Sequence, residues 1–274
     1  MRHLARCLSA ILLSALSAGP AFSQCVSLTT SGVASSQSFN TLSSTAGSTT
    51  NNLTITGWFM TETGGGARDN EQYAVDTGGS NTGDTYSYGA AGNADRALGG
   101  LQSGTLIPVI GACFTNNTGV TVSSLNIAYT GEQWRSGNTA AARDDRLDFQ
   151  YSTNATSLTT GTWTDVNALD FTNPVKTVGT AGALDGNNAA NRTAVSSAIP
   201  ALSIANGATF WIRWNDLNAS GADDGLAVDD FSLTPNGGPV LPNLSVNDVA
   251  MAEGDAGTTT LTFTVSLSAP AGAG

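Results

Sequence analysis

The 274-residue sequence carries 21 aspartate and glutamate residues against 10 lysine and arginine residues, which gives a net charge of −11. A surface this acidic repels phosphate backbones, so the segment is not expected to bind nucleic acid directly. His3 is the only histidine. The sequence after it therefore cannot supply the histidine of a serine–histidine or cysteine–histidine catalytic pair, or of a zinc site built on imidazole.

The N-terminus has the pattern of a secretory signal peptide. A basic start at Arg2 and Arg6 precedes an apolar run over residues 8–16 and small residues before a cleavage point after Ser23. The run is too short for a membrane anchor, and Gln24 occupies the position where a lipoprotein signal has a small residue. No later stretch is long and apolar enough to cross a membrane. The pattern predicts a secreted or cell-surface protein whose signal peptide is removed.

Short alternating runs dominate the chain after the signal peptide, and Gly, Ser, Thr and Asn fill the intervals between them. A period of two buries one face of a strand and leaves the other solvated, and two stacked sheets bury many such faces together. We therefore predict an all-β fold, with one antiparallel β-sandwich of jelly-roll type over residues 24–234. The clearest runs are Leu53–Trp58, Tyr73–Val75, Tyr86–Tyr88, Leu125–Tyr129, Leu147–Tyr151, Phe210–Trp214 and Leu226–Phe231.

Two cysteines, Cys25 and Cys113, remain after the signal peptide. An even number of cysteines in an oxidising compartment favours a disulfide that ties the N-terminus to an inner strand. The alternative is a buried thiol at Cys113, whose neighbours are mostly apolar.

The densest group of acidic residues lies between Asp216 and Asp230. Asp216, Asn218, Asp223 and Asp224 offer carboxylate and amide oxygens on a flexible segment, which is the chemistry that Ca²⁺ prefers. We therefore predict a structural calcium ion here. The alternative is a polar turn between two strands, in which Asp and Asn serve turn geometry.

Asp229 and Asp230 fall within a predicted strand, where neighbouring side chains point to opposite faces. A carboxylate at the rim of the core needs a partner. We therefore favour a salt bridge to Arg213 or Arg135 over a metal-binding role for this pair. A catalytic pair is the remotest alternative, because the Glu-x-Asp-x-x-Glu strand of sandwich glycosidases has no match in the chain.

Tryptophan side chains at the surface of a sandwich can stack on sugar rings. Trp214 shares a face with Phe210 and Ile212, which places it in the core. Trp211 falls on the opposite face and is the best candidate for an exposed, ligand-binding ring.

The predicted domains are a signal peptide over residues 1–23, the sandwich over 24–234, a Pro- and Gly-rich linker over 235–243, and an incomplete domain over 244–274. In the last, LSVNDVAMAEGDAGTTTLTFTVSLSAPAG resembles the opening of a Calx-beta domain through Val246, Glu253-Gly254 and the alternating TLTFTVSLS run. The resemblance implies an immunoglobulin-like sandwich that binds calcium, and Glu253 is the family's acidic ligand present in this segment.

A second resemblance covers residues 35–235. GDTYSYGAAGNADRALGGL, YTGEQWRSG and GLAVDDFSL resemble the N-terminal module of large secreted bacterial proteins, and the last also resembles the final strand of MAM and concanavalin-like jelly rolls. The resemblance to this module does not imply any activity for the chain.

Together these patterns predict a non-catalytic extracellular binding or adhesion module with a structural calcium ion, part of a larger secreted or cell-surface protein. Its partner would be an extracellular protein or a carbohydrate. One alternative is the accessory front end of a secreted hydrolase, a nuclease or phosphatase, whose catalytic domain lies beyond residue 274. The other alternative is a carbohydrate-binding module.

Overall fold

The computed structural model describes residues 24–137, 142–176, 180–238, 244–252, 254–258 and 260–267. The predicted signal peptide and Glu253 lie outside these residues. The described part of the chain contains no helix with the length and apolar character that crossing a bilayer requires.

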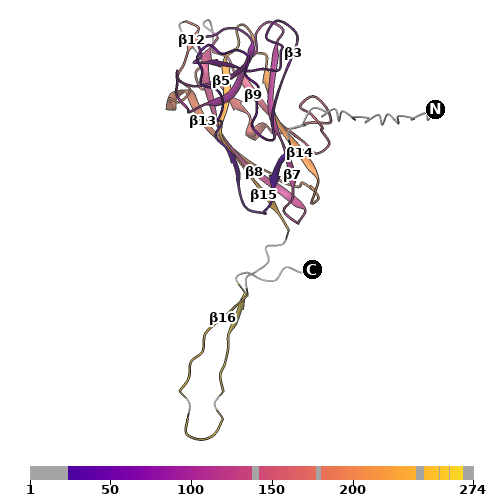
Figure 1. Ribbon diagram of the computed structural model, residues 1–274, viewed down its shortest axis with the longest axis vertical. Coiled ribbons are helices and arrows are strands. Elements are labelled where there is room, and N and C mark those ends of the chain that lie inside the picture. The colour runs from indigo at the N-terminus through magenta and orange to yellow at the C-terminus, as the bar shows by residue number, and fades with distance from the viewer. Residues whose placement is uncertain are drawn as a thin grey trace, which may run out of the picture.

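Two stacked sheets form the body of the protein (Figure 1), which confirms the predicted all-β sandwich. The first sheet has the order β1-β7-β14-β9-β10, with β3 also on β7 and β11 also on β9. Its strands are β1 Val26–Leu28, β3 Trp58–Thr63, β7 Ile107–Asn116, β9 Arg146–Ser152, β10 Thr164–Asp165, β11 Phe171–Thr172 and β14 Thr209–Leu217.

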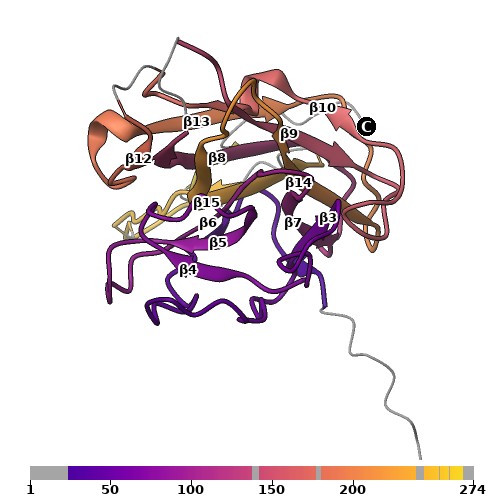
Figure 2. The ribbon, with the colours of Figure 1, turned by 90° about the horizontal axis from the view of Figure 1, so that it is seen from above.

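The second sheet has the order β12-β8-β15-β6-β5-β4, with β13 also on β8 and β2 also on β15. Its strands are β2 Ser35–Gln37, β4 Ala74–Asp76, β5 Asp84–Tyr88, β6 Ala97–Leu101, β8 Val122–Ser136, β12 Gly182–Ala183, β13 Arg192–Ile199 and β15 Gly225–Gly237. Two short 3₁₀ helices, η1 Asn167–Leu169 and η2 Ala189–Asn191, lie in connections. Figure 2 shows the two sheets side by side, one on each side of the view.

The pairing is antiparallel except at two short strands, where β1 runs parallel to β7 and β4 runs parallel to β5. Cys25 and Cys113 are joined by a disulfide next to the β1–β7 pair, with their Cα atoms 4.7 Å apart. The bridge therefore attaches the first strand of the sandwich to the central strand β7, the position expected from the sequence.

Aromatic rings fill the space between the sheets. Trp58 stacks on Trp214 with ring centroids 6.1 Å apart, and Phe231 meets both rings edge-on. Trp214 is fully buried, as its place beside Phe210 and Ile212 in the sequence predicts. Each such side chain contributes about 1.5–3 kcal/mol by leaving water, so this aromatic layer is a main source of the sandwich's stability.

Two strand limits differ from the prediction. Residues 53–57 are not a strand, because Gly57 turns the chain at φ 76° and Trp58 N donates to Ile55 O at 3.0 Å. At the other end, β15 continues to Gly237 and pairs with β8 up to Val122. The sandwich strand thus extends past the predicted boundary at residue 234.

The segment after the predicted linker contains an antiparallel pair, β16 Leu244–Val246 and β17 Val265–Leu267. Leu244 lies opposite Leu267 and Val246 opposite Val265, so these apolar side chains share one face, and all four are exposed. An isolated two-stranded hairpin is marginally stable in water. The Calx-beta resemblance of this segment stays a prediction.

Candidate functional site

Buried charges gather at one end of the sandwich. At this end, called the loop end below, β3, β6, β8 and β14 finish and β5, β7, β9 and β15 begin, as the pairs Thr63–Ile107, Leu101–Asp84, Leu217–Arg146 and Arg135–Gly225 show. Buried acidic residues are rarely retained without a partner or a function. Those at the loop end are Glu62, Asp84, Asp145, Asp148, Asp216, Asp223 and Asp224.

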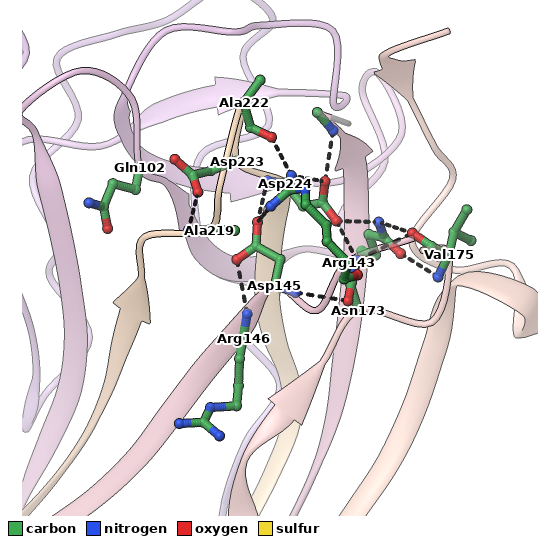
Figure 3. A network of polar contacts seen from close by, with 12 residues as sticks. Gln102, Arg143, Asp145, Arg146, Asn173, Val175, Ala219, Ala222, Asp223 and Asp224 are labelled. Atoms are coloured by element: carbon green, nitrogen blue, oxygen red, sulfur yellow. Dashed lines mark hydrogen bonds and ion pairs between the residues drawn. The ribbon is translucent and has the colours of Figure 1, made fainter. Parts of the chain in front are cut away.

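Arg143 joins two of these carboxylates (Figure 3). Its Nη1 lies 3.2 Å from Asp145 Oδ2 and its Nη2 lies 3.0 Å from Asp224 Oδ1. Nη2 also donates to the carbonyl of Ala222. The Arg143 side chain is only 10% exposed, so these ion pairs are shielded from solvent and hold the start of β9 against the start of β15.

Asp224 accepts hydrogen bonds on both carboxylate oxygens (Figure 3). Oδ1 accepts from Gly137 N at 2.7 Å as well as from Arg143, and Oδ2 accepts from Asn173 Nδ2 at 2.7 Å and Gln133 Nε2 at 2.8 Å. Donors from four separate positions therefore surround this carboxylate, and it links the loops of the two sheets.

Asp216 has a different environment. Its Oδ2 accepts from Gln102 N at 3.1 Å, whereas its buried Oδ1 has no hydrogen-bond partner. Gln102 Oε1 is likewise buried without a partner. Among the described residues, no lysine or arginine forms an ion pair with Asp216. Burial, reinforced by the charges of Asp145 and Asp223, raises the pKa of Asp216 well above its ordinary value.

Asp223 closes the turn that connects β14 and β15. Its Oδ1 accepts from Ala219 N at 2.7 Å, which is the turn role that the sequence left as an alternative. The side chain is 8% exposed, and burial raises its pKa. In Figure 3 the carboxylate extends toward the side on which Gln102 lies.

Of the residues predicted to bind calcium, the fold brings Asp216, Asp223 and Asp224 together at the loop end. Asn218 is exposed, and Glu253 lies outside the described residues. Across the ranges that the structure describes, no three His, Cys, Asp or Glu side chains form a group that could hold a metal ion. A cation at the loop end would therefore need amide, main-chain or water oxygens in addition to these carboxylates. The sequence did not indicate that Gln102 lies beside Asp216, because the two residues are 114 positions apart in the chain.

A cavity of about 240 Å³ opens beside these residues. It is lined mainly by loop residues, and apolar side chains are few. The polar side chains around it are Asn81, Gln102, Ser103, Arg135 and Asp223.

A second carboxyl pair lies at the loop end. Glu62 Oε2 accepts from the main-chain nitrogens of Asn70 and Glu71 at 3.1 and 3.2 Å. Asp84 pairs with Arg68 at 2.9 Å, and its Oδ1 is buried without a hydrogen-bond partner. Burial, reinforced by the Glu62 carboxyl, raises the pKa of Asp84 to about 8. The pair fastens the 64–72 loop to the sandwich.

Two expectations from the sequence are wrong. Trp211 is not an exposed ring: it is 6% exposed and packs against Phe59 with centroids 4.8 Å apart, because the segment containing Ala155 and Leu158 covers this side of the first sheet. A sugar cannot stack on a ring covered in this way.

The expected salt bridge from Asp229 or Asp230 to Arg213 or Arg135 is also absent from the described ion pairs. Arg213 instead lies over the Trp163 ring at 4.0 Å. A register shift between Asp229 and Ser232, with Asp230 at φ 48°, leaves Asp229 buried, and that burial raises its pKa to about 8.

No protein-family model matches the sequence, and no curated protein matches it either. Among solved structures, the chain is similar to the K3 adhesin domain of Lys-gingipain from Porphyromonas gingivalis, at 11% identity over 65% of this chain and 91% of that one, with a TM-score of 0.40.

It is also similar to a tandem CBM22 region of Xyn10C from Paenibacillus barcinonensis, at 12% identity over 79% of this chain and 50% of that one, with a TM-score of 0.35. A further similar structure is TmCBM61 in complex with β-1,4-galactotriose, at 9% identity over 53% and 74% of the two chains, with a TM-score of 0.27. Likenesses this distant leave the function to be argued from the chain's own side chains.

Proposed function

We propose that this chain is a non-catalytic binding module of an exported protein and that it holds a structural calcium ion at the loop end. The observation that carries the proposal is Asp216, a buried carboxylate with one oxygen unpartnered and no ion-pair partner among the described lysine and arginine side chains. A buried carboxylate of this kind either keeps a proton or binds a cation.

The neighbouring oxygens favour a cation. Asp223 and Gln102 each present a side-chain oxygen at the same end of the fold, and Gln102 Oε1 also lacks a partner. Ca²⁺ accepts carboxylate, amide and water oxygens in irregular geometry, whereas Mg²⁺ requires a near-ideal octahedron. Asp224 is left out of this set because donors already surround both of its oxygens.

The carboxyl groups best suited to acid–base chemistry serve the fold instead. Burial raises the pKa of Glu132 to about 7, close to that of a general acid or base. Glu132 is 1% exposed, however, and accepts a hydrogen bond from Trp134 Nε1 at 2.8 Å. Its neighbour Asp229 is 5% exposed. Groups so enclosed have no access to a substrate, which supports a binding role over a catalytic one.

Thermal unfolding of the exported chain with calcium, magnesium or chelator tests the proposal. Calcium should raise the melting temperature more than magnesium, since a ligand bound only by the folded state stabilises it by about 2.7 kcal/mol at a hundredfold excess over its dissociation constant. Asp216→Asn should remove the calcium shift.

Asp144→Asn is the matched control, because Asp144 is an exposed carboxylate at the same end, with its side chain 69% exposed. This variant loses the same charge and should keep the calcium shift. Protein shown to be free of calcium that melts at the same temperature with and without millimolar calcium would contradict the proposal.

A further inference from the structure

We propose that Gln24 is a modification site, at which the side chain closes onto the α-amino group of the mature N-terminus and forms a pyroglutamate. This inference rests on the proposed export of the chain and adds the chemical state of its first residue. It does not depend on the proposed calcium ion.

The first step is the cleavage point in the sequence. Ala21 and Ser23 are small residues placed as a signal-peptide cleavage requires. Gln24 follows directly, so removal of the signal peptide makes this glutamine the N-terminal residue. An N-terminal glutamine carries an amine and a carboxamide on the same residue, and these two groups can close a five-membered ring.

The second step is that the fold leaves Gln24 accessible while it fixes the residues after it. Gln24 is exposed and lies before the first strand. Cys25 is joined to Cys113 by the disulfide, and the pairing of β1 with β7 begins at Val26 and does not include Gln24. Ring closure at Gln24 therefore removes no hydrogen bond from the sheet, and its product fits the observed fold.

The third step is the chemistry of the closure. The unprotonated α-amino nitrogen of Gln24 attacks the side-chain carbonyl carbon Cδ, the new N–Cδ bond closes the lactam, and the Cδ–Nε2 bond breaks. The attacking nitrogen gives up one proton, and Nε2 leaves with it as ammonia. The reaction needs no oxidant, metal or second substrate. It removes a positive charge, since a free α-amino group is largely protonated at neutral pH.

The fourth step is the surroundings of Gln24. This residue lines a cavity of about 360 Å³ beside β1 and β2, which also contacts the buried rings of Trp58, Phe114 and Phe231. The residues that line it include no Asp, Glu, Lys or Arg within the described part of the chain. A free α-ammonium group would be the single formal charge at this cavity. The lactam leaves the cavity uncharged and gives the mature chain an end that lacks the free amine required by aminopeptidases.

Mass spectrometry of the exported, folded protein tests the proposal. The N-terminal peptide, released by a protease and reduced at Cys25, should be lighter by one ammonia than the sequence beginning at Gln24 requires. Edman degradation of the untreated chain should give no residue in the first cycle. After treatment with pyroglutamyl aminopeptidase, the sequence should begin at Cys25.

The matched control is Gln24→Asn. This variant keeps an amide at the same exposed position, but its side chain is one methylene shorter, so closure onto the α-amino nitrogen would need a strained four-membered ring. It should retain a free α-amino group and give asparagine in the first Edman cycle. Gln37→Asn changes another glutamine that lines the same cavity and should leave the loss of ammonia at Gln24 unchanged.

The outcomes separate this inference from the proposed export. An exported chain that begins at Gln24 and still has a free α-amino group after prolonged incubation at neutral pH overturns the pyroglutamate and leaves export intact. A blocked N-terminus in Gln24→Asn also overturns it, because the block then does not come from the glutamine side chain. A secreted chain that begins at another residue overturns the site alone, whereas a chain that retains residues 1–23 contradicts the proposed export as well.

Discussion

Removal of the disulfide tests how the first strand is attached. In the double variant Cys25→Ala and Cys113→Ala, the three-residue strand β1 keeps only its parallel pairing to β7, from Val26–Phe114 to Leu28–Asn116. Cys113 is 1% exposed and packs beside Val109 and Trp211. The change therefore acts on the unfolded chain through the lost cross-link and on the folded chain through a small gap behind the first sheet.

The expected magnitude follows from the 88-residue separation of the two cysteines. The chain-entropy relation for a closed loop of this length gives about 4.6 kcal/mol at 25 °C. Measured losses for native disulfides of small exported domains run from about 2 to 5 kcal/mol. Because folded domains have free energies of unfolding of only about 5–15 kcal/mol, the variant should unfold at a clearly lower urea concentration.

Urea unfolding of the oxidised protein, the reduced protein and the double variant measures this loss. The reduced protein controls for the substitutions, since it loses the cross-link without losing any side chain. In the reduced protein and the double variant, hydrogen exchange at the β1 main-chain amides should become faster than exchange at the β7 main-chain amides. If the double variant and the reduced protein unfold at the same urea concentration as the oxidised protein, with unchanged slope, then the bridge contributes nothing to stability and the reasoning fails.

Two further predictions concern the buried charges. Arg143→Met should lower the free energy of unfolding by about 3–5 kcal/mol, because removing one partner of a buried pair leaves uncompensated charge. Adding Asp224→Asn to this variant should restore part of the lost free energy. A loss below about 1 kcal/mol for Arg143→Met in urea unfolding would contradict the prediction. The pKa of Asp84 is raised to about 8 in the folded protein, so its contribution to stability is fully present below its ordinary value near 4 and is lost as the pH rises toward 8. In chelator, the free energy of unfolding should fall between pH 5 and 8.5 and fall less in Asp84→Asn; an equal fall in both proteins would show that Asp84 does not titrate as described.

The fold class follows from the sequence because strand periodicity is local. Alternation over Leu147–Tyr151, Phe210–Trp214 and Leu226–Phe231 requires two faces of different polarity wherever the strands are placed, and stacked sheets satisfy that requirement. Strand β6 Ala97–Leu101 escaped prediction because all five of its residues are buried, so it shows no alternation. The glycine at position 99 is required by a tertiary contact, because a Cβ there would lie 2.0 Å from Leu226 O on the neighbouring strand.

Which faces are covered, and which distant side chains meet, was decided by the tertiary structure alone. Alternation separates Trp211 from Trp214 but does not reveal that a later segment packs over Trp211. Asp216 is recognisable in the sequence as part of an acidic loop, whereas its contact with Gln102 joins positions 114 residues apart. Local sequence determines the direction of a side chain relative to its own strand. The partners that it meets, and with them the charge and chemistry of the loop end, depend on how strands far apart in the chain pack.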